Sequence, residues 1–384
     1  MASTLPQATT LFWDLNSKFP PDRQRSCSVI GLEGNRVTLD IGRAQAVAKN
    51  AIYDIYTRRT YLIFQAQVID TTDFTATAEL VRHGESIPNT FVEVDDFAIL
   101  RTWALPERTV VKFHSSRDDL RGWLKSDLEQ IPNLVLDEEN SPNAHLEVKI
   151  NEQYGFDIWQ QDKRLERLPI VHLEPDERQA IAKLAQVLRH VTRFQAIQSM
   201  SCQAPGGHVQ DGHFEFILEK NGNKLTHTDS KRFRVGDKEE GLGVRLRYTG
   251  SFEPAWVSII EFGMSWGVSI IYESILLKGA LEPPETFEPT KCTWKLAEKG
   301  REDDSNGGID RWVVYISEGK SRPGWSDMLL PQLPVHGSSL PVDSLIHRPP
   351  EVKGVTTRSA PMNARMDAPN PRGWGVVEYE FQVD

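Results

Sequence analysis

Cysteine is scarce in this sequence, with only three among 384 residues. Cys27, Cys202 and Cys292 are far apart and odd in number, so they define neither a disulfide framework nor a closely spaced metal-binding pair. We therefore expect a reducing compartment and a cytoplasmic protein. Cys202 follows a predicted helix, where the negative end of the helix dipole disfavours a thiolate, and we expect no catalytic thiol there.

An excess of positive charge is also missing. The chain has 44 Lys and Arg residues against 54 Asp and Glu residues, a formal net charge of −10. Binding to a polyanion needs a basic surface that neutralises phosphates. The sequence therefore predicts no nucleic-acid partner.

Long apolar runs are lacking as well. The longest apolar stretch is 262–272, whereas a helix that spans a bilayer needs about 20 consecutive apolar residues. We predict no membrane span. The first residues also lack the basic start and apolar core of a signal peptide, which agrees with a cytoplasmic protein.

Catalytic motifs are few. There is no Gly-x-Ser-x-Gly elbow, and the glycines of 241–250 lack the spacing and the following helix of a phosphate-binding loop. The sequence predicts no catalytic residue and no cofactor. One metal-site hypothesis remains, at His208, Asp211 and His213, whose imidazole and carboxylate groups suit a divalent cation. The alternative is a pair of solvated histidines, because their spacing in a loop fixes no ligand geometry.

What the sequence does contain is mostly short runs that alternate apolar and polar residues, such as Leu62, Phe64, Ala66 and Val68. This period of two is typical of antiparallel strands with one buried face. The predicted fold class is mostly β with α (α+β): a small β-barrel-like N-terminal domain, a helical element and an antiparallel β-sandwich. The expected divisions are an N-terminal segment 1–24, the barrel and its extension 25–115, a helix-containing region 116–211, the sandwich 212–330, a Pro-rich tether 331–373 and a terminal strand 374–384.

Two helices are predicted in the middle region. The first follows Ser116, a suitable N-cap, and ends before Pro132. The second, over 174–201, has Pro175 in its first turn and one apolar stripe. That stripe consists of Ile181, Leu184, Leu188, Val191 and Phe194.

The C-terminal part combines seven short strand patterns over 212–330 with a Pro-rich, aperiodic segment and a well-patterned end. In that end, Val377, Tyr379, Phe381 and Val383 alternate with polar residues. A strand needs a partner for its backbone, so the terminal strand docks either on a sheet of its own chain or on another molecule. We expect the intramolecular arrangement, because it avoids the entropy cost of association.

Tryptophans are the last signal, since six of ten lie between Trp256 and Trp374. In a β-sandwich such rings mostly fill the core, and the alternative is an exposed platform that binds a partner or a sugar. Trp256, Trp266 and Trp325 are the candidate binding residues. Trp325, in a turn-rich segment, is the one that we expect outside a strand.

Several segments resemble the C-terminal region of fungal caspase-like proteins. They are GNRVTLDIGRAQAVAKNAIYDIYT, LEPDERQAIAKLAQVLRHVTRFQAI, RWVVYISEGKSRPGWSDMLLPQL and RGWGVVEYEFQV. The protease domain of that family is absent, and His83 and His336, each followed by glycine, have no matching cysteine. The resemblance implies a non-catalytic accessory protein that recognises or regulates a caspase-like protease in a cell-death or defence pathway. A carbohydrate- or surface-binding sandwich protein and a metal-dependent hydrolase are the alternatives.

Overall fold

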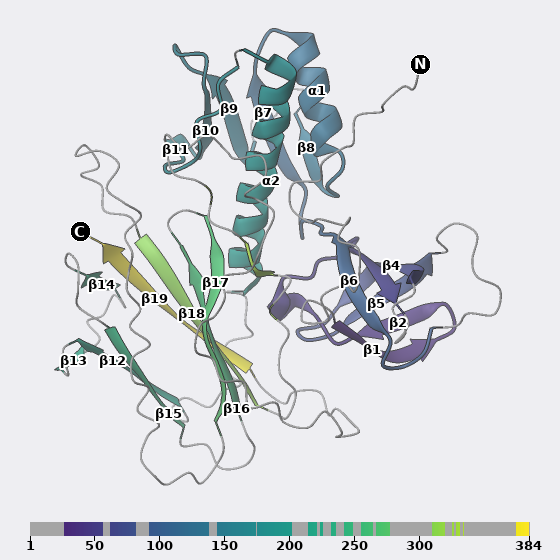
Figure 1. Cartoon of the computed structure of the whole chain (residues 1–384), viewed down its shortest axis with the longest axis vertical. Helices are drawn as coiled ribbons and strands as arrows, with labels where there is room; N and C mark the ends of the chain where they lie inside the picture. Colours follow the sequence, from purple (N-terminus) through teal and green to yellow (C-terminus); the bar gives the residue numbers. More distant parts are fainter. Residues whose placement is uncertain are drawn as a thin grey trace, which may run out of the picture.

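The computed structural model describes residues in two parts of the chain, and the second part is interrupted more often than the first. The first comprises 27–56, 62–81, 92–137, 144–173 and 175–201. The second comprises 214–220, 223–225, 232–235, 242–248, 255–263, 266–276, 309–318, 325, 328–330, 333 and 374–383. The N-terminal segment 1–24 and, apart from Leu333, the Pro-rich segment 331–373 lie outside the described residues. Within the described residues the fold is mostly β with two α-helices, as predicted (Figure 1).

The first module is a closed β-barrel, drawn in purple and blue in Figure 1. Its strands are β1 (Cys27–Glu33), β2 (Arg36–Leu39), β3 (Ile52–Tyr56), β4 (Leu62–Thr71), β5 (Ala76–Val81) and β6 (Phe97–Thr102), with a short 3-10 helix η2 (Arg43–Gln45) after β2. They follow the order β1-β2-β5-β4-β3-β6, and β6 closes the circle by pairing with both β3 and β1. Leu39, Ile55 and Val68 fill the interior and are fully buried.

This barrel confirms the predicted small β-barrel-like domain, and the alternating pattern of its strands is the reason. The closing strand β6 lies beyond the clearest alternating runs, and without it the sheet would keep an open edge. The last strand of the barrel ends at Thr102, and the next strand, at 109–114, belongs to another sheet.

The second module is a five-stranded sheet with two helices. Its elements are β7 (Thr109–His114), α1 (Asp118–Leu128), β8 (Leu134–Leu136), β9 (Leu146–Ile150), β10 (Phe156–Gln160), β11 (Lys163–Arg164) and α2 (Glu177–Ser201). The strands follow the order β11-β10-β9-β7-β8, and β7 runs parallel to both β8 and β9. Because α1 connects the parallel strands β7 and β8, these elements form a βαβ unit. The sequence predicted the helices here but not the sheet.

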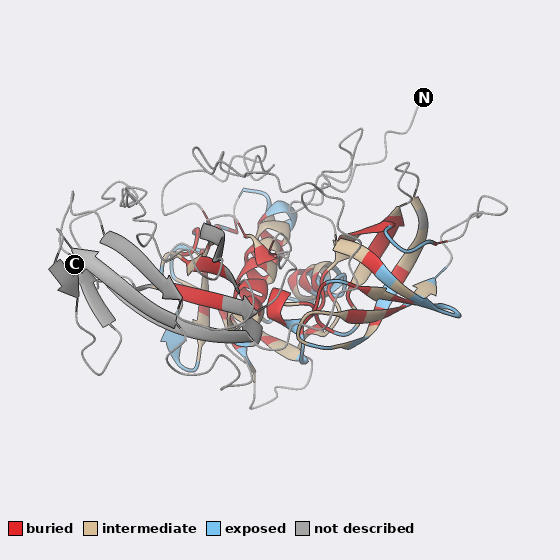
Figure 2. Ribbon diagram, turned by 90° about the horizontal axis from the view of Figure 1, so that it is seen from below, coloured by how far each residue is buried: buried red, intermediate tan, exposed pale blue. Residues whose placement is uncertain are grey.

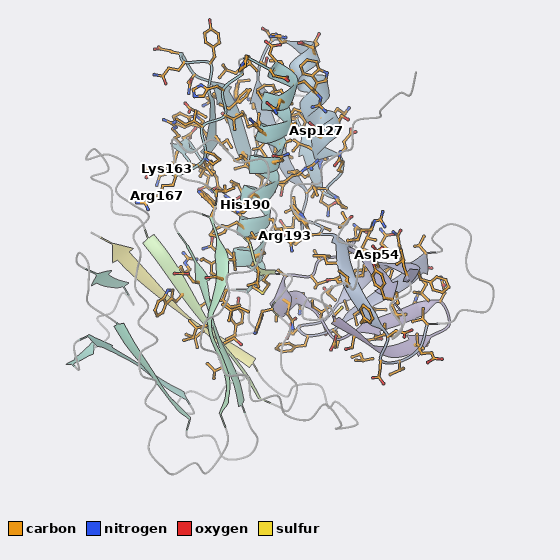
Figure 3. The ribbon with its side chains drawn as sticks, viewed as in Figure 1. Asp54, Asp127, Lys163, Arg167, His190 and Arg193 are labelled. Atoms are coloured by element: carbon orange, nitrogen blue, oxygen red, sulfur yellow. The ribbon has the colours of Figure 1, made fainter. Side chains whose placement is uncertain are left out.

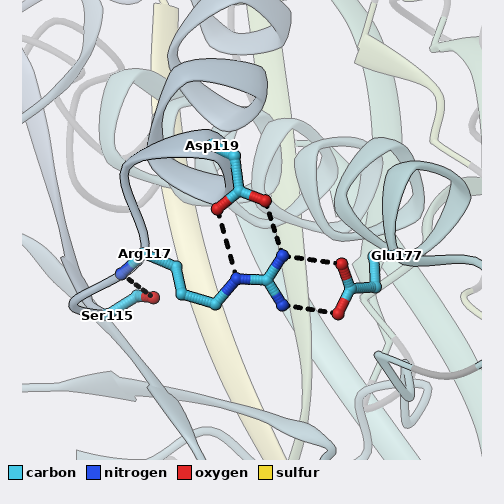
Figure 4. Close-up of polar contacts among 4 residues, drawn as sticks. All are labelled: Ser115, Arg117, Asp119 and Glu177. Carbon is cyan, nitrogen blue, oxygen red and sulfur yellow. Dashed lines mark hydrogen bonds and ion pairs between the residues drawn. The ribbon is translucent and has the colours of Figure 1, made fainter.

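The start of α1 differs from the prediction. Arg117 rather than Ser116 occupies the N-cap position, without a side-chain capping bond, and its backbone N–H donates to Ser115 Oγ over 3.2 Å. The Arg117 guanidinium joins the two helices instead, because it donates to both Asp119 and Glu177 (Figure 4). The first turns of α1 and α2 are thereby tied together.

The C-terminal part contains two sheets. A three-stranded sheet has the order β13 (Asn223–Leu225), β12 (Phe214–Lys220), β15 (Leu242–Tyr248). A five-stranded sheet has the order β14 (Arg232–Val235), β19 (Trp374–Val383), β18 (Ile309–Glu318), β16 (Ala255–Phe262), β17 (Val268–Leu276). The expectation of purely antiparallel pairing is wrong at one place, since β14 and β19 run parallel.

The terminal strand pairs within its own chain. β19 pairs antiparallel with β18 from Trp374 to Gln382 and parallel with β14 on its other side. The intramolecular arrangement expected from the sequence is thus confirmed. The strand lies inside the sheet, between two neighbours, rather than at an edge.

The apolar core links the modules. One cluster of buried side chains extends from the barrel through Trp103 and Leu105 to the inner faces of α1 and α2 (Figure 2). A second cluster joins the C-terminal half of α2 to the five-stranded sheet. Among the described residues, no helix is long and apolar enough to cross a membrane.

Candidate functional site

Helix α2 connects the modules, because it packs against the barrel, the α/β sheet and the C-terminal sheet. Asp176 is its N-cap, with Oδ1 accepting the Gln179 N–H over 3.0 Å, so the helix proper begins after Pro175 and not at 174. The predicted apolar stripe is buried along its whole length, from Ile181 to Phe194. Burial of this stripe holds the helix in a fixed place between the sheets.

The C-terminal half of α2 forms what we call the α2 junction, defined by Trp103, His190, Arg193, Phe194 and Trp266. Figure 3 labels His190 and Arg193 on this half of the helix, above the C-terminal sheet. Phe194 packs edge-on against Phe262 of β16 and against Trp266, with ring centroids 5.6 and 5.2 Å away. Ala44 of η2 belongs to the same buried cluster.

Trp266 fastens the C-terminal sheet to this junction. It lies in the turn between β16 and β17 at a φ of 63°, and its backbone carbonyl accepts a hydrogen bond from His190 Nε2 over 2.7 Å. Its indole N–H donates to the Glu166 carbonyl over 3.1 Å. One residue therefore contacts both α2 and the segment after β11.

Arg193 connects the junction to the segment between the barrel and the α/β sheet. Its side chain is buried, and its guanidinium carbon lies 5.1 Å from the ring centroid of Trp103, in the segment that links barrel and α/β sheet. This is a cation–π contact in a desolvated place, where it is worth about 2 kcal/mol. The described contacts of the junction thus serve to hold the modules together.

The sequence-predicted tryptophans take different places. Trp325 lies outside a strand, as expected, but it is only 3% exposed, its Nε1–H donates to Ser258 Oγ over 2.7 Å and its ring meets Tyr315. A buried ring offers no platform, so the interpretation of Trp325 as a binding residue is corrected to a core residue. Trp266 is partly buried at the junction, and of Trp256 only the backbone in β16 is described.

The metal-site hypothesis falls outside this part of the chain. His208, Asp211 and His213 are not among the described residues. In the part that is described, no group of three His, Cys, Asp or Glu side chains is arranged to hold a metal ion.

One acidic side chain lies inside the C-terminal sheet. Glu261 of β16 is opposite Ser269 and Trp312 in the strand registers, and Ser269 Oγ donates to Glu261 Oε2 over 2.8 Å. Burial raises the pKa of Glu261, and the contacts with Ser269 and Trp312 oppose that rise only in part.

The most exposed large aromatic ring among the described residues belongs to Tyr154, at 60%. It lies in the turn between β9 and β10, where its φ of 56° is in the left-handed region that bulky residues rarely adopt. Asn151 fixes this turn, because its Oδ1 accepts the N–H groups of Gln153 and Gly155 over 3.0 and 2.9 Å, and its Nδ2 donates to Asp157. We call 151–155 the Tyr154 turn.

A neighbouring segment widens this surface. The Leu173 N–H donates to the Tyr154 carbonyl over 2.8 Å, and Gly155 forms a β-bridge with His172. Ile170 and His172 are exposed on that segment, and the Ile170 side chain lies 3.3 Å from where a Cβ of Gly155 would be. Together Tyr154, Ile170 and His172 form what we call the Tyr154 patch, an exposed surface whose backbone these bonds hold in place.

Sequence reasoning did not find this patch. The polar run from Asn151 to Gly155 is a turn signal, and glycine is the residue expected to take the left-handed position. Here the backbone bonds place Tyr154 in that conformation instead. Comparison with protein-family models and with curated proteins gives no match for this chain.

Proposed function

We propose that this protein is a non-catalytic recognition protein that presents the Tyr154 patch to a protein partner. The observation that carries this proposal is the exposed Tyr154 ring, held at a positive φ by the three side-chain hydrogen bonds of Asn151. A strained residue persists only where the surroundings enforce it, and such residues gather at functional sites.

The energetics of protein interfaces support this assignment. Tyrosine is enriched among the residues that dominate binding, because its ring buries a large area while few torsions are immobilised. A turn that is already rigid loses little further entropy when a partner binds. The Tyr154 patch combines both properties, with an aliphatic neighbour at Ile170 and a polar one at His172.

The partner that we propose is a caspase-like protease or a protein of its pathway, in the cytoplasm. Support comes from the resemblance of 34–57, 173–197, 311–333 and 372–383 to the non-catalytic region of fungal caspase-like proteins. Support for the compartment comes from the three widely spaced cysteines.

We also infer that the two C-terminal sheets pack as a sandwich. In β16 and β18, Ile260 and Val313 are buried against α2, whereas Ile259 and Val314, on the opposite face, are buried as well. A sheet buried on both faces needs a second layer on the side away from α2. The three-stranded sheet is the candidate for that layer.

The test places a photo-reactive benzophenone in the site of the tyrosine ring. Protein carrying p-benzoylphenylalanine at position 154 is irradiated in extract of the native host, and crosslinked chains are identified by mass spectrometry. We expect one dominant partner, with a caspase-like chain as the result that supports the whole proposal. The matched control carries the same group at the exposed position of Gln130, just after α1.

Three outcomes would contradict the proposal. Equal crosslinking from positions 154 and 130 would mean that the patch has no specific partner. Loss of the crosslink in the Ile170→Asp protein is expected, and its persistence would place the contact elsewhere. Turnover of caspase-type peptides by the purified protein would contradict the non-catalytic assignment.

A further inference from the structure

The barrel has a second surface of a different kind, at the end of strand β1. The pairing of β1 with β6 covers Cys27 and Ser28, and one more pair of backbone hydrogen bonds joins Val29 to Asp95 and Asp96 over 2.8 Å. In the rest of β1, Gly31–Glu33 pairs with β2, and among the described residues Ile30–Glu33 has no strand on its other side.

A β-bulge produces this arrangement. The register of β1 against β2 shifts between Val29 and Gly31, so that Ile30 is the extra residue. A bulge bends its strand and increases the local twist, which turns the end of the β1–β2 hairpin away from β6. Backbone groups along the outer side of 30–33 are thereby left available as a strand edge.

Apolar side chains line this edge. Ile30 and Leu32 are 40% and 45% exposed, and Val94, which precedes the residue bonded to Val29, is 45% exposed. Strand residues two apart share a face, so the side chains of Ile30 and Leu32 are both available to a strand laid beside β1. We call Ile30, Leu32 and Val94, with the adjoining backbone, the β1 edge.

The charge around the edge is negative. Glu33, Glu93 and Asp95 are exposed beside these residues, and Glu79 lies opposite Arg36 at the hairpin end. Among the residues named at this end, Arg36 is the one basic side chain. It lies opposite Glu33 in β1 and opposite Glu79 in β5. A docking segment therefore meets an acidic surround that favours Lys and Arg.

We propose that the β1 edge binds an extended segment of another protein in which apolar residues alternate with Lys or Arg. Backbone hydrogen bonds to 30–33 would supply affinity by adding a strand to the barrel, and the alternate side chains would meet Ile30, Leu32 and Val94. This site is separate from the Tyr154 patch and stands on different residues.

The test uses three fluorescein-labelled peptides of seven residues with blocked ends. One alternates Val and Lys, the second alternates Val and Glu, and the third is the Val–Lys peptide with N-methyl groups on alternate amides, which cannot complete the ladder. Fluorescence anisotropy at low salt measures binding to the full chain. We expect the Val–Lys peptide to bind at least about ten-fold more tightly than either of the others.

Variants localise the binding. Leu32→Lys and Val94→Lys should each weaken the Val–Lys peptide about ten-fold or more, because each puts a like charge on the edge. Gln130→Lys puts a lysine at an exposed position just after α1, in another module, and should leave binding unchanged. Hydrogen exchange of the amides of 30–33 should slow when the peptide is bound.

Other occupants of the edge give different results and would overturn the proposal. Slow exchange of 30–33 in the free monomer would mean that the chain covers its own edge. A concentration-dependent dimer in sedimentation that Leu32→Lys abolishes would assign the edge to a second copy. Equal binding of the Val–Glu and Val–Lys peptides would remove the charge argument.

Discussion

His190 of α2 donates a hydrogen bond from Nε2 to the backbone carbonyl of Trp266, over 2.7 Å. The imidazole is buried, and the carbonyl belongs to the turn between β16 and β17. This bond joins α2, which belongs to the α/β module, to the C-terminal sheet. It is the polar counterpart of the apolar contacts that Phe194 makes in the same place.

We predict that His190→Ala weakens the coupling between these modules. Leaving the Trp266 carbonyl without its donor costs about 1–3 kcal/mol, in addition to the cavity left by the ring. Thermal unfolding followed by calorimetry should show a lower Tm and a C-terminal sheet that unfolds ahead of the rest. Gln195→Ala is the control, since it removes a bond to Gln160 inside the α/β module. An identical profile for both variants would show that the junction does not couple the modules.

A second prediction concerns strain in the Tyr154 turn. Tyr154→Asn places a residue that tolerates the left-handed region where tyrosine pays about 1–2 kcal/mol, so the Tm should stay equal or rise. The same change should abolish binding of the partner that the crosslink from position 154 identifies. Asn151→Ala should do the opposite to stability, because two backbone N–H groups lose their acceptor. A lower Tm for Tyr154→Asn would mean that the ring stabilises the fold.

The third prediction is a pH dependence at Glu261. Burial raises its pKa above the ordinary value of 4.5, so above that pH the folded state keeps a proton that the unfolded state has lost. Stability contributed by this group therefore falls as the pH rises from about 4.5 through the folded-state pKa. Glu261→Gln cannot titrate, and its Tm should gain on the wild type between pH 4.5 and 7.5. Ser126→Ala, which changes no ionisable group at an exposed position of α1, should show no such gain.

The fourth prediction concerns acid. Hydrogen bonds from Arg117 lower the pKa values of Glu177 and Asp119 below their ordinary 4.5 and 3.8. Their stabilising effect is present above those ordinary values and is lost as the pH falls through the folded-state values. The double variant Asp119→Asn, Glu177→Gln should lose less Tm than the wild type on acidification from pH 5 to 3. A parallel decline of both proteins would show that this exposed cluster contributes nothing measurable.

The local sequence pattern predicted those strands and helices in which the buried residues repeat at the spacing of the element itself. Ala66 and Val68 alternate along β4 and lie inside the barrel, and Leu184 and Leu188 repeat along α2 and lie in its core. In each case one strand or helix contains the whole signal, so no knowledge of its neighbours is needed.

In the α/β sheet the signal is incomplete, although β9 does alternate buried Leu146 and Val148 with polar residues. β8 and β11 are three and two residues long, too short to show a period. β7 pairs with β8 and β9, and other segments of the chain lie between these strands in the sequence. A pattern within one short stretch of sequence cannot reveal such a pairing. Trp325 shows the same limit for sites, because whether an indole faces water or Ser258 depends on a strand far away in the sequence. The Tyr154 patch depends on which turn residue takes the positive φ, and that is decided by backbone bonds.

The place of β19 in its sheet constrains the order in which the chain can fold. β14, at 232–235, is bonded to the five-stranded sheet through β19, which follows about 140 residues later. Until 374–383 has been synthesised, β18 has an open edge and β14 has no place in the sheet. Closing so long a loop is entropically costly, so this module should be the slowest to form. During that interval the barrel and the α/β sheet, whose pairings are complete by residue 164, can already be folded.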